Sequence, residues 1–331
     1  RRGIVFKSAQ MLEAAGRVST AVFCARGTLL LGEPELSTID TLSSLAQDEV
    51  LALVAGAEQY GAHPVAVAIQ RAARAHNIQA DAIRSPHYQP GLGVTAVASH
   101  GKPLVVGSRG LMLKERISVA RAEARITELE ASGRTVLLVA LDNHLVGLLS
   151  LQDGLRAGAR AAVQHLLDVG IEPVLLSGDS RETCASLGRT IDIDHIRPDV
   201  LPADRGREVE RLRSGGANVA VVGRSPTDDV ALGAASVSVA LPGLGNNNSD
   251  FDIELGNDEV QKAALALRIA HQLSKATLKA VTVMLVGASL ALLCLLALGM
   301  PAGWLPVAYL GISLFAALPL LTASAPGEPA P

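Results

Sequence analysis

Residues 21–34 read AVFCARGTLLLGEP, and this stretch decides the fold class. An apolar run at 18–23 ends at Cys24, and a Gly-Thr pair follows at Gly27 and Thr28. Buried strands of parallel sheets end in this way and present a chemically active side chain to the loop at their carboxyl end. The pattern therefore predicts a strand over 18–23 and places Cys24 at the edge of a sheet where sites form.

From Lys7 to Asn257, apolar strand-like runs alternate with helical stretches, which is typical of a parallel sheet covered by helices. The segment between 36 and 142 departs from this pattern, because two helical stretches follow one another and short strands come after them. We therefore expect an α/β fold with a smaller α+β domain inserted after the first strand. The expected strands are 18–23, 135–141, 145–151, 173–176, 218–222 and 236–241, with shorter ones at 94–97 and 104–106, and the expected helices are 49–60, 65–76, 159–167 and 205–212.

The residues from 280 to 327 carry no charge and form two apolar segments of about 20 residues on either side of Pro301, the length that crosses a bilayer. Arg268, Lys275 and Lys279 precede them, so the positive-inside rule puts the preceding domains in the cytoplasm. A pair of buried core helices is the alternative, although uncharged runs of this length are uncommon in soluble proteins. We expect a multi-pass membrane protein with a transmembrane hairpin. The expected boundaries are 1–34 with 149–257 for the sheet domain, 35–148 for the inserted domain, 258–279 for a linking helix, 280–324 for two membrane helices and 325–331 for a tail.

Composition argues against two other classes. The formal charge is −3, with acidic and basic residues interspersed, so we expect no nucleic-acid partner. The three cysteines lie far apart without metal-ligand spacing, which argues against a zinc site and against disulfides. The chain opens with Arg1 and no initiator Met, so we expect it to be the later part of a longer protein.

Seven short motifs follow one another along the chain. They are AVFCARGTLLLGEP at 21–34, AEQYGAHP at 57–64, PGLGV at 90–94, LQDGLR at 151–156, LLSGDS at 175–180, LPADR at 201–205 and GRSPTDDVAL at 223–232. In this order they resemble the P-type ATPases, in particular the heavy-metal-transporting branch, whose phosphorylation domain belongs to the haloacid dehalogenase superfamily. The resemblance covers nearly the whole chain. It implies a haloacid dehalogenase-like Rossmannoid parallel sheet, an inserted nucleotide-binding domain and the last two membrane helices of that family.

The phosphorylation motif of the family, DKTGT, is only partly present. Gly27 and Thr28 match it, but Cys24 stands where the family has the aspartate that accepts the phosphoryl group. By the same resemblance Asp179 and Arg205 fall on catalytic positions, Arg205 in place of the family's lysine. The implied catalytic positions are therefore Cys24, Thr28, Asp179 and Arg205, with the nucleophile lost.

The magnesium ligands of the family are changed as well. In the hinge motif GDGxNDAPAL, Asp228 matches, whereas Arg224 replaces the first aspartate, which holds Mg²⁺ in the family together with the phosphorylated carboxylate. Mg²⁺ prefers oxygen ligands, but Cys24 offers a soft sulfur and Arg224 a positive charge. A like charge at about 4 Å costs roughly 4 kcal/mol at an effective dielectric near 20. We expect the Mg²⁺ site at Asp228 to be lost.

The inserted domain keeps more of the family pattern. The resemblance implies nucleotide contacts at Glu58 and His63, and at Gly91, Gly93 and Gly107, where glycine lets the backbone approach a ligand closely. ATP is therefore an expected ligand of this domain.

Cys24 leaves a second role open. Cationic neighbours such as Arg26 or Arg224 lower the pKa of a thiol and make it a nucleophile. The phosphate loop of tyrosine phosphatases has a cysteine and an arginine separated by five residues, but here Leu30 stands at the arginine's place. A small buried hydrophobe is the role that we favour for Cys24.

The leading hypothesis is a degenerate heavy-metal P-type ATPase-like membrane protein, a pseudoenzyme that binds nucleotide and has a regulatory or structural role. Its partners would be the membrane and either an active transporter or an N-terminal half of the same chain. The alternative is an active ATP-driven metal-cation transporter with a non-standard catalytic site. A soluble phosphatase of the same superfamily is disfavoured, because that chemistry needs the missing aspartate.

Overall fold

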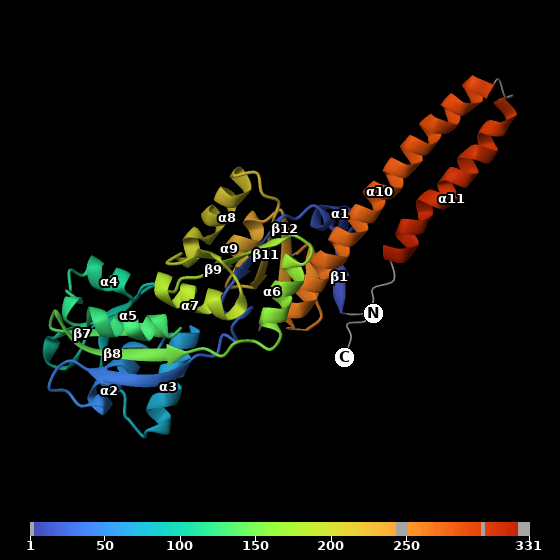
Figure 1. Cartoon of the computed structure of the whole chain (residues 1–331). Coiled ribbons are helices and arrows are strands. Elements are labelled where there is room, and N and C mark those ends of the chain that lie inside the picture. The colour runs from blue at the N-terminus through green and yellow to red at the C-terminus, as the bar shows by residue number, and fades with distance from the viewer. Residues whose placement is uncertain (1–2, 243–250, 258, 299–301, 324–331) are drawn as a thin grey trace.

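The computed structural model describes residues 3–242, 251–257, 259–298 and 302–323. Figure 1 shows two α/β bodies in contact and a pair of long helices that projects from one of them. Each body is built on its own sheet, which agrees with the expected parallel sheet and inserted α+β domain.

The first sheet has seven strands, and β2 lies inside it with all five of its residues buried. Its neighbours β11 and β9 run parallel to it, and β1 pairs antiparallel with β13 at one edge. Across the sheet the order is β1 (Ile4–Phe6), β13 (Ile253–Leu255), β12 (Val237–Leu241), β11 (Val219–Arg224), β2 (Thr20–Cys24), β9 (Glu172–Leu176) and β10 (His195–Arg197).

Helices cover both faces of this sheet. Successive residues of β2 point to opposite faces, so each layer of helices packs against its own set of β2 side chains. Ala21 and Phe23 belong to an apolar cluster with α1 (Ala9–Gly16), α6 (Ala159–Leu167), α7 (Arg181–Ile191) and the first part of α10 (Val260–Leu298). Val22 and Cys24 belong to the cluster on the other face, with α8 (Arg205–Ser214) and α9 (Asp229–Ala234). Cys24 therefore faces α8 and α9.

The second sheet is antiparallel and belongs to the inserted domain. Helices α2 and α3 pack on one face and α4 and α5 on the other. β8 continues to Gln152, past the boundary expected at 148, because its last residues still pair with β3. The strand order is β3 (Glu35–Thr41), β8 (His144–Gln152), β7 (Thr135–Leu141), β6 (Pro103–Gly107), β5 (Gly93–Val97) and β4 (Arg84–Gln89), and the helices are α2 (Gln47–Ala57), α3 (Pro64–Ala75), α4 (Arg109–Lys114) and α5 (Glu123–Ala131).

α10 is a single helix of 39 residues, about 58 Å long at 1.5 Å per residue. Its first part packs on the sheet, and the rest runs beside α11 (Leu305–Ala323) away from the α/β bodies (Figure 1). The linking helix expected at 258–279 and the first expected membrane helix are thus one continuous helix. Within the described ranges, one segment is long and apolar enough to cross a membrane, Val260–Cys294 of α10.

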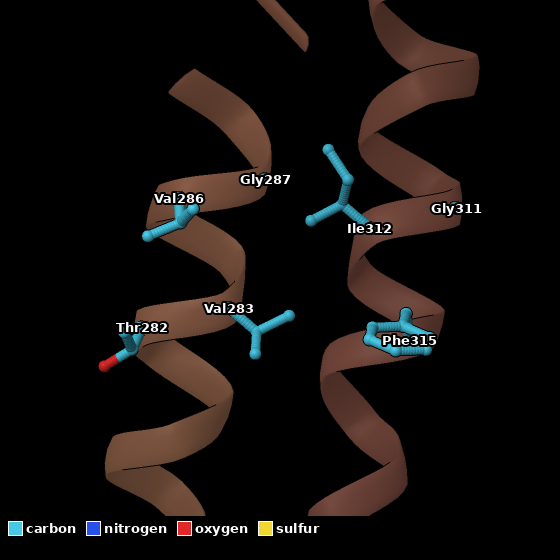
Figure 2. A pocket seen from close by; sticks show the side chains of 7 residues that line it. All are labelled: Thr282, Val283, Val286, Gly287, Gly311, Ile312 and Phe315. Carbon is cyan, nitrogen blue, oxygen red and sulfur yellow. The ribbon is translucent and has the colours of Figure 1, made fainter. Parts of the chain in front are cut away.

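The two long helices enclose an open apolar groove of about 550 Å³. Figure 2 shows Val283 and Ile312 pointing into the space between the helices, and Phe315 of α11 also lines the groove. At Gly287 a Cβ atom would lie 2.9 Å from Cγ2 of Ile312, so the close approach of the helices depends on this glycine.

Side chains join the two α/β bodies at the carboxyl end of β9. Arg26, in the loop after β2, forms a 2.6 Å ion pair with Asp179, and its Nη2 also donates to Oγ1 of Thr135 in β7, at 2.9 Å. Oγ1 of Thr135 in turn donates to Oδ1 of Asp179, at 2.9 Å. Close by, Oγ1 of Thr183 donates to the carbonyl of Arg134 at 2.9 Å. The inserted domain is thus fixed to the sheet domain next to the loop that carries Cys24.

Gly16 sets how closely α1 approaches α10. A Cβ atom here would lie 2.6 Å from Cβ of Ser274 and 2.8 Å from the carbonyl oxygen of Ala270. Replacing glycine by alanine in a helix normally raises the free energy of unfolding by about 1 kcal/mol. Here the new Cβ atom would clash with α10, so we expect Gly16→Ala to lower the free energy of unfolding by about 1–3 kcal/mol instead. Thermal unfolding followed by circular dichroism measures the effect. Gly233→Ala in α9, where a Cβ meets no atom within 4 Å, is the matched control and should be neutral or stabilising; equal losses in both would contradict the close contact.

Asp179 is 9% exposed and joins the two bodies, so its loss should cost stability. We expect Asp179→Asn to lower the free energy of unfolding by about 2 kcal/mol, because Arg26 and Thr135 lose a charged acceptor. The change in unfolding midpoint should be about 4–8 °C for domains of this size. Asp192→Asn, which removes an exposed 2.7 Å pair with Arg160, is the control and should cost less than about 1 kcal/mol. A smaller effect at Asp179 than at Asp192 would show that the contact does not hold the bodies together.

Candidate functional site

Three predicted site residues meet on the face of the sheet covered by α8 and α9. Cys24 ends β2 and is 1% exposed, Arg205 is the first residue of α8, and Asp228 is the N-cap of α9. The Cys24 thiol and the Asp228 carboxylate lie close enough for each group to shift the pKa of the other. Nη1 of Arg205 forms an ion pair with Oδ1 of Asp228, and the backbone N–H of Arg224 donates to Oδ2 at 2.9 Å. Both oxygens of this buried carboxylate are therefore engaged by donors from the protein itself.

The electrostatics keep Cys24 in its neutral form. Burial, and next the negative charge of Asp228, raise the pKa of the thiol well above its ordinary value, and the nearby Arg205 offsets only part of this. Burial also raises the pKa of Asp228, against the hydrogen bond from the Arg224 backbone and the charge of Arg205. Only the thiolate is a good nucleophile, so this geometry favours the role of a small buried residue, which we preferred for Cys24, over that of an activated thiol.

The loop after β2 keeps a fixed shape. Gly27 has a φ of +81°, in the left-handed region that glycine adopts without strain. The hydroxyl of the fully buried Thr28 donates to the carbonyl oxygen of Cys24. Asp153 accepts the backbone N–H of Gly32 at 3.1 Å. Arg156 donates to the carbonyl of Gly27 at 3.3 Å. The loop is thus held by its own hydroxyl and by the segment between β8 and α6.

Asp179 comes after β9, next to β2, but its carboxylate bonds with groups other than Cys24. It accepts from Arg26 and Thr135, as described above, and from Oγ of Ser177 at 2.8 Å. Burial alone would raise the pKa of Asp179, but Arg26 and the two hydroxyls outweigh it and hold the pKa below its ordinary value. This carboxylate is therefore ionised, and it holds Arg26, Thr135 and Ser177 in place through its hydrogen bonds.

Glu58 and His63 lie together at the start of α3. His63 is the N-cap of this helix, and its Nδ1 accepts the backbone N–H of Ala66 at 3.2 Å, while Pro64 takes the first helical position. Its Nε2 lies 3.0 Å from Oε2 of Glu58, although the two atoms are not aligned for a hydrogen bond. Glu58 is 1% exposed, and within the described part of the chain its Oε2 has no hydrogen-bond partner. The pair thus leaves one buried acceptor open beside an imidazole that is 46% exposed.

The three predicted glycines lie at the end of the second sheet nearest the loop before α8. Gly93 of β5 pairs with Gly107 of β6. A Cβ on Gly93, at a φ of +141°, would lie 2.2 Å from the carbonyl oxygen of Val106, and one on Gly91 would lie 2.7 Å from Cδ of Pro202. Glycine is therefore required at Gly93 by close contact with backbone and at Gly91 by the side chains of the other body, so Gly91 adds a further contact between the two bodies.

Sequence reasoning missed part of the site. Thr135 and Ser177 were not predicted as partners of Asp179, and Thr135 lies 109 residues from Arg26, its other partner. The sequence offered one signal for these contacts. Arg26 is a charged residue among small and apolar residues in the loop motif, so it needs a polar partner. Among the described residues no group of three or more His, Cys, Asp or Glu side chains is placed to hold a metal ion.

Comparison with known proteins agrees with this geometry. The family model of haloacid dehalogenase-like hydrolases matches residues 18–236. The chain is 30% identical over 313 residues to a copper-exporting P-type ATPase of Staphylococcus haemolyticus, which is 94% of this chain and 38% of that protein. It is 37% identical over 246 residues to the probable cation-transporting P-type ATPase J of Mycobacterium tuberculosis, which is 73% of this chain and 37% of that protein. The chain thus spans less than half the length of these relatives.

Solved structures agree with the sequence relatives. A zinc-transporting PIB-type ATPase in the E2.Pi state matches 98% of this chain and 53% of its own, with a TM-score of 0.59 and 26% identity. The catalytic domain of the CPx-ATPase CopB-B shares the fold over 81% of this chain and 95% of its own, with a TM-score of 0.62 and 22% identity. The chain therefore belongs to the haloacid dehalogenase-like hydrolase family, in its heavy-metal P-type ATPase branch.

Proposed function

We propose that this chain is part of a heavy-metal P-type ATPase-like membrane protein that binds nucleotide but does not form the aspartyl-phosphate. The observation that carries the proposal is the bonding of Asp228, whose two carboxylate oxygens are engaged by Arg205 and by the backbone N–H of Arg224. A buried thiol, whose pKa is raised by burial and by the charge of Asp228, holds the position of the family nucleophile. Without phosphoryl transfer, the role of the chain is regulatory or structural.

The inserted domain fits an adenine nucleotide. A buried acceptor without a partner costs free energy, and Oε2 of Glu58 is such an acceptor among the described residues. The exocyclic amino group of adenine would supply the missing donor. The exposed face of His63, next to this oxygen, offers a flat surface on which a base can stack.

The residues at the end of β2 do not fit the magnesium ion of the family. Mg²⁺ takes oxygen ligands in a nearly octahedral arrangement. Oδ1 of Asp228 is paired with Arg205, and Oδ2 accepts the N–H of Arg224. The two other family ligand positions supply a thiol and a guanidinium, so we derive no step through Mg²⁺ at this site.

We further propose that α10 and α11 both cross the membrane and that the α/β bodies lie in the cytoplasm. Arg268, Lys275 and Lys279 of α10 precede its uncharged part and favour this orientation. The relatives are named for copper and cation transport. A heavy-metal cation would then be the cargo of an active transporter beside this chain, or of an N-terminal half of the same chain.

The proposed loss of phosphoryl transfer is tested with the full chain in detergent micelles. We expect incubation with ATP labelled at the γ-phosphate, with Mg²⁺ and then an acid quench, to leave no labelled protein, because the acceptor carboxylate is absent. A labelled band that disappears in Cys24→Ala would instead establish the alternative, an active ATP-driven metal-cation transporter with a thiol as phosphoryl acceptor.

The matched control for this assay is the double variant Cys24→Asp, Arg224→Asp. It places two more carboxylates beside Asp228, and clustered carboxylates repel each other unless a cation is bound. Mg²⁺ should therefore raise the unfolding midpoint of the double variant but leave that of the wild-type chain unchanged. An equal rise in both proteins would show that the wild-type site binds the ion.

The reactivity of Cys24 gives an independent test. Because its pKa is raised, the thiol stays protonated at pH 8, and burial also shields it, so iodoacetamide should modify it only after unfolding. Cys184, also buried and with a pKa raised to about 12, is the internal control and should behave alike. Mass spectrometry of peptides from native and urea-unfolded chain reads both positions. Rapid modification of Cys24 alone in the native chain would support the thiol nucleophile.

A further inference from the structure

The loop that joins α2 to α3 carries the buried acceptor of the proposed nucleotide site. Glu58 is the C-cap of α2 and is 1% exposed, and within the described residues its Oε2 has no hydrogen-bond partner. A helix leaves its last carbonyl groups without partners inside the helix, so groups from elsewhere must bind the chain at this point. The position of Oε2 therefore depends on what holds the backbone on either side of Glu58.

One side chain from another element binds this backbone on both sides of Glu58. Oη of Tyr88, in β4, donates to the carbonyl oxygen of Ala57 at 2.9 Å and accepts the backbone N–H of Tyr60 at 3.3 Å. Its ring packs against the apolar core of the inserted domain. Burial raises the pKa of Tyr88 above its ordinary value, so the hydroxyl keeps its proton at neutral pH. Tyr88 thus brackets Glu58 with one donated and one accepted hydrogen bond.

The carboxylate of Glu58 lies against the backbone of the same loop. The backbone N–H of Gly61 donates to the carbonyl oxygen of Glu58 at 3.1 Å. A Cβ atom built on Gly61 would lie 2.7 Å from Oε2 of Glu58 and 3.3 Å from Nε2 of His63. A displacement of the loop that Tyr88 binds would therefore displace this oxygen as well.

Tyr88 also connects this loop to the glycine-rich turn of the inserted domain. It pairs with Val94 of β5, and the next residue, Gln89, pairs with Gly93. The turn between these two strands contains Gly91, another position that the family resemblance assigns to the nucleotide. Two separate parts of the predicted nucleotide site are therefore joined through this tyrosine.

We propose that Tyr88 is a positioning residue for the nucleotide, because its two hydrogen bonds hold Oε2 of Glu58 where it accepts the exocyclic amino group of adenine. This role rests on the proposed nucleotide binding and deepens it by naming a residue that sets the preference for a base with an amino donor. A hydrogen bond forms only within a narrow range of distance and angle. Loss of the Tyr88 hydroxyl should therefore reduce this preference more than it reduces binding of the rest of the ligand.

Isothermal titration calorimetry of the full chain in detergent micelles tests the proposal with two probes. Adenosine carries the exocyclic amino group, and purine riboside is the same nucleoside without it. We expect the wild-type chain to bind adenosine about tenfold more tightly, because a hydrogen bond to a charged acceptor contributes a factor of this order. Tyr88→Phe, which removes one oxygen atom, should weaken adenosine binding about fivefold and purine riboside binding less than about twofold.

Tyr60→Phe is the matched control, because it makes the same chemical change within the loop itself. The side chain of Tyr60 is 73% exposed, and its hydrogen bond to Tyr88 is made by the backbone, which the substitution keeps. Both affinities and their ratio should stay unchanged in this variant. A general loss of structure in Tyr88→Phe would weaken both nucleosides equally, so the ratio of the two affinities separates positioning from stability.

Hydrogen exchange followed by mass spectrometry gives a readout that needs no ligand. In peptides that cover 57–61, the amide of Tyr60 should be protected in the wild-type chain although its side chain is exposed. It should exchange at least about fivefold faster in Tyr88→Phe. Unfolding midpoints measured in parallel show whether the variant is folded, and the wild-type measurement keeps the proposal falsifiable if it is not.

Two kinds of result overturn the proposal, and they are distinguishable. An unprotected Tyr60 amide in the wild-type chain, or a folded Tyr88→Phe variant that keeps the wild-type ratio of the two affinities, would contradict the role of Tyr88 and leave the proposed nucleotide binding standing. A wild-type chain that binds neither nucleoside, or both equally, would contradict the proposed adenine contact itself, and the role of Tyr88 would fall with it.

Discussion

A carboxylate buried between a strand end and two helix starts is stable only if donors surround it, and Asp228 meets this constraint entirely from within the protein. Arg205 pairs with one oxygen, and the backbone N–H of Arg224 donates to the other. Both oxygens of this carboxylate thus have donors from the protein itself, which stabilises the buried charge.

The second constraint is the contact between the two α/β bodies. Asp179 is ionised although it is buried, because Arg26, Thr135 and Ser177 supply its partners. Two of these groups belong to the sheet domain and one to the inserted domain, so the charge that stabilises Asp179 also fixes the inserted domain beside the Cys24 loop. The inserted domain, with Glu58 and His63, and the sheet domain, with the Cys24 loop, are thereby held in one arrangement.

Much of the fold and of the candidate site could be predicted from the sequence, and there are physical reasons why the other strands and contacts were missed. The strand at Cys24 and the helix at 159–167 were predictable because buried runs and amphipathic periods are local signals. The strands Glu35–Thr41 and Arg84–Gln89 were missed, because their polar residues carry no such signal and form strands only by pairing with β8 and β5. Motif order likewise located Cys24 and Arg224, but the bonding of Arg26 to Thr135 depends on how a distant strand packs, which no local pattern encodes.

The most direct test of the account is whether Asp228 binds a divalent cation. Mn²⁺ substitutes for Mg²⁺, and electron paramagnetic resonance measures how much of it stays free during titration of the full chain. The account predicts the same titration curve for the wild-type chain and for Asp228→Asn, since the protein's own donors already occupy this carboxylate. One tightly bound Mn²⁺ per wild-type chain, lost in Asp228→Asn, would contradict it.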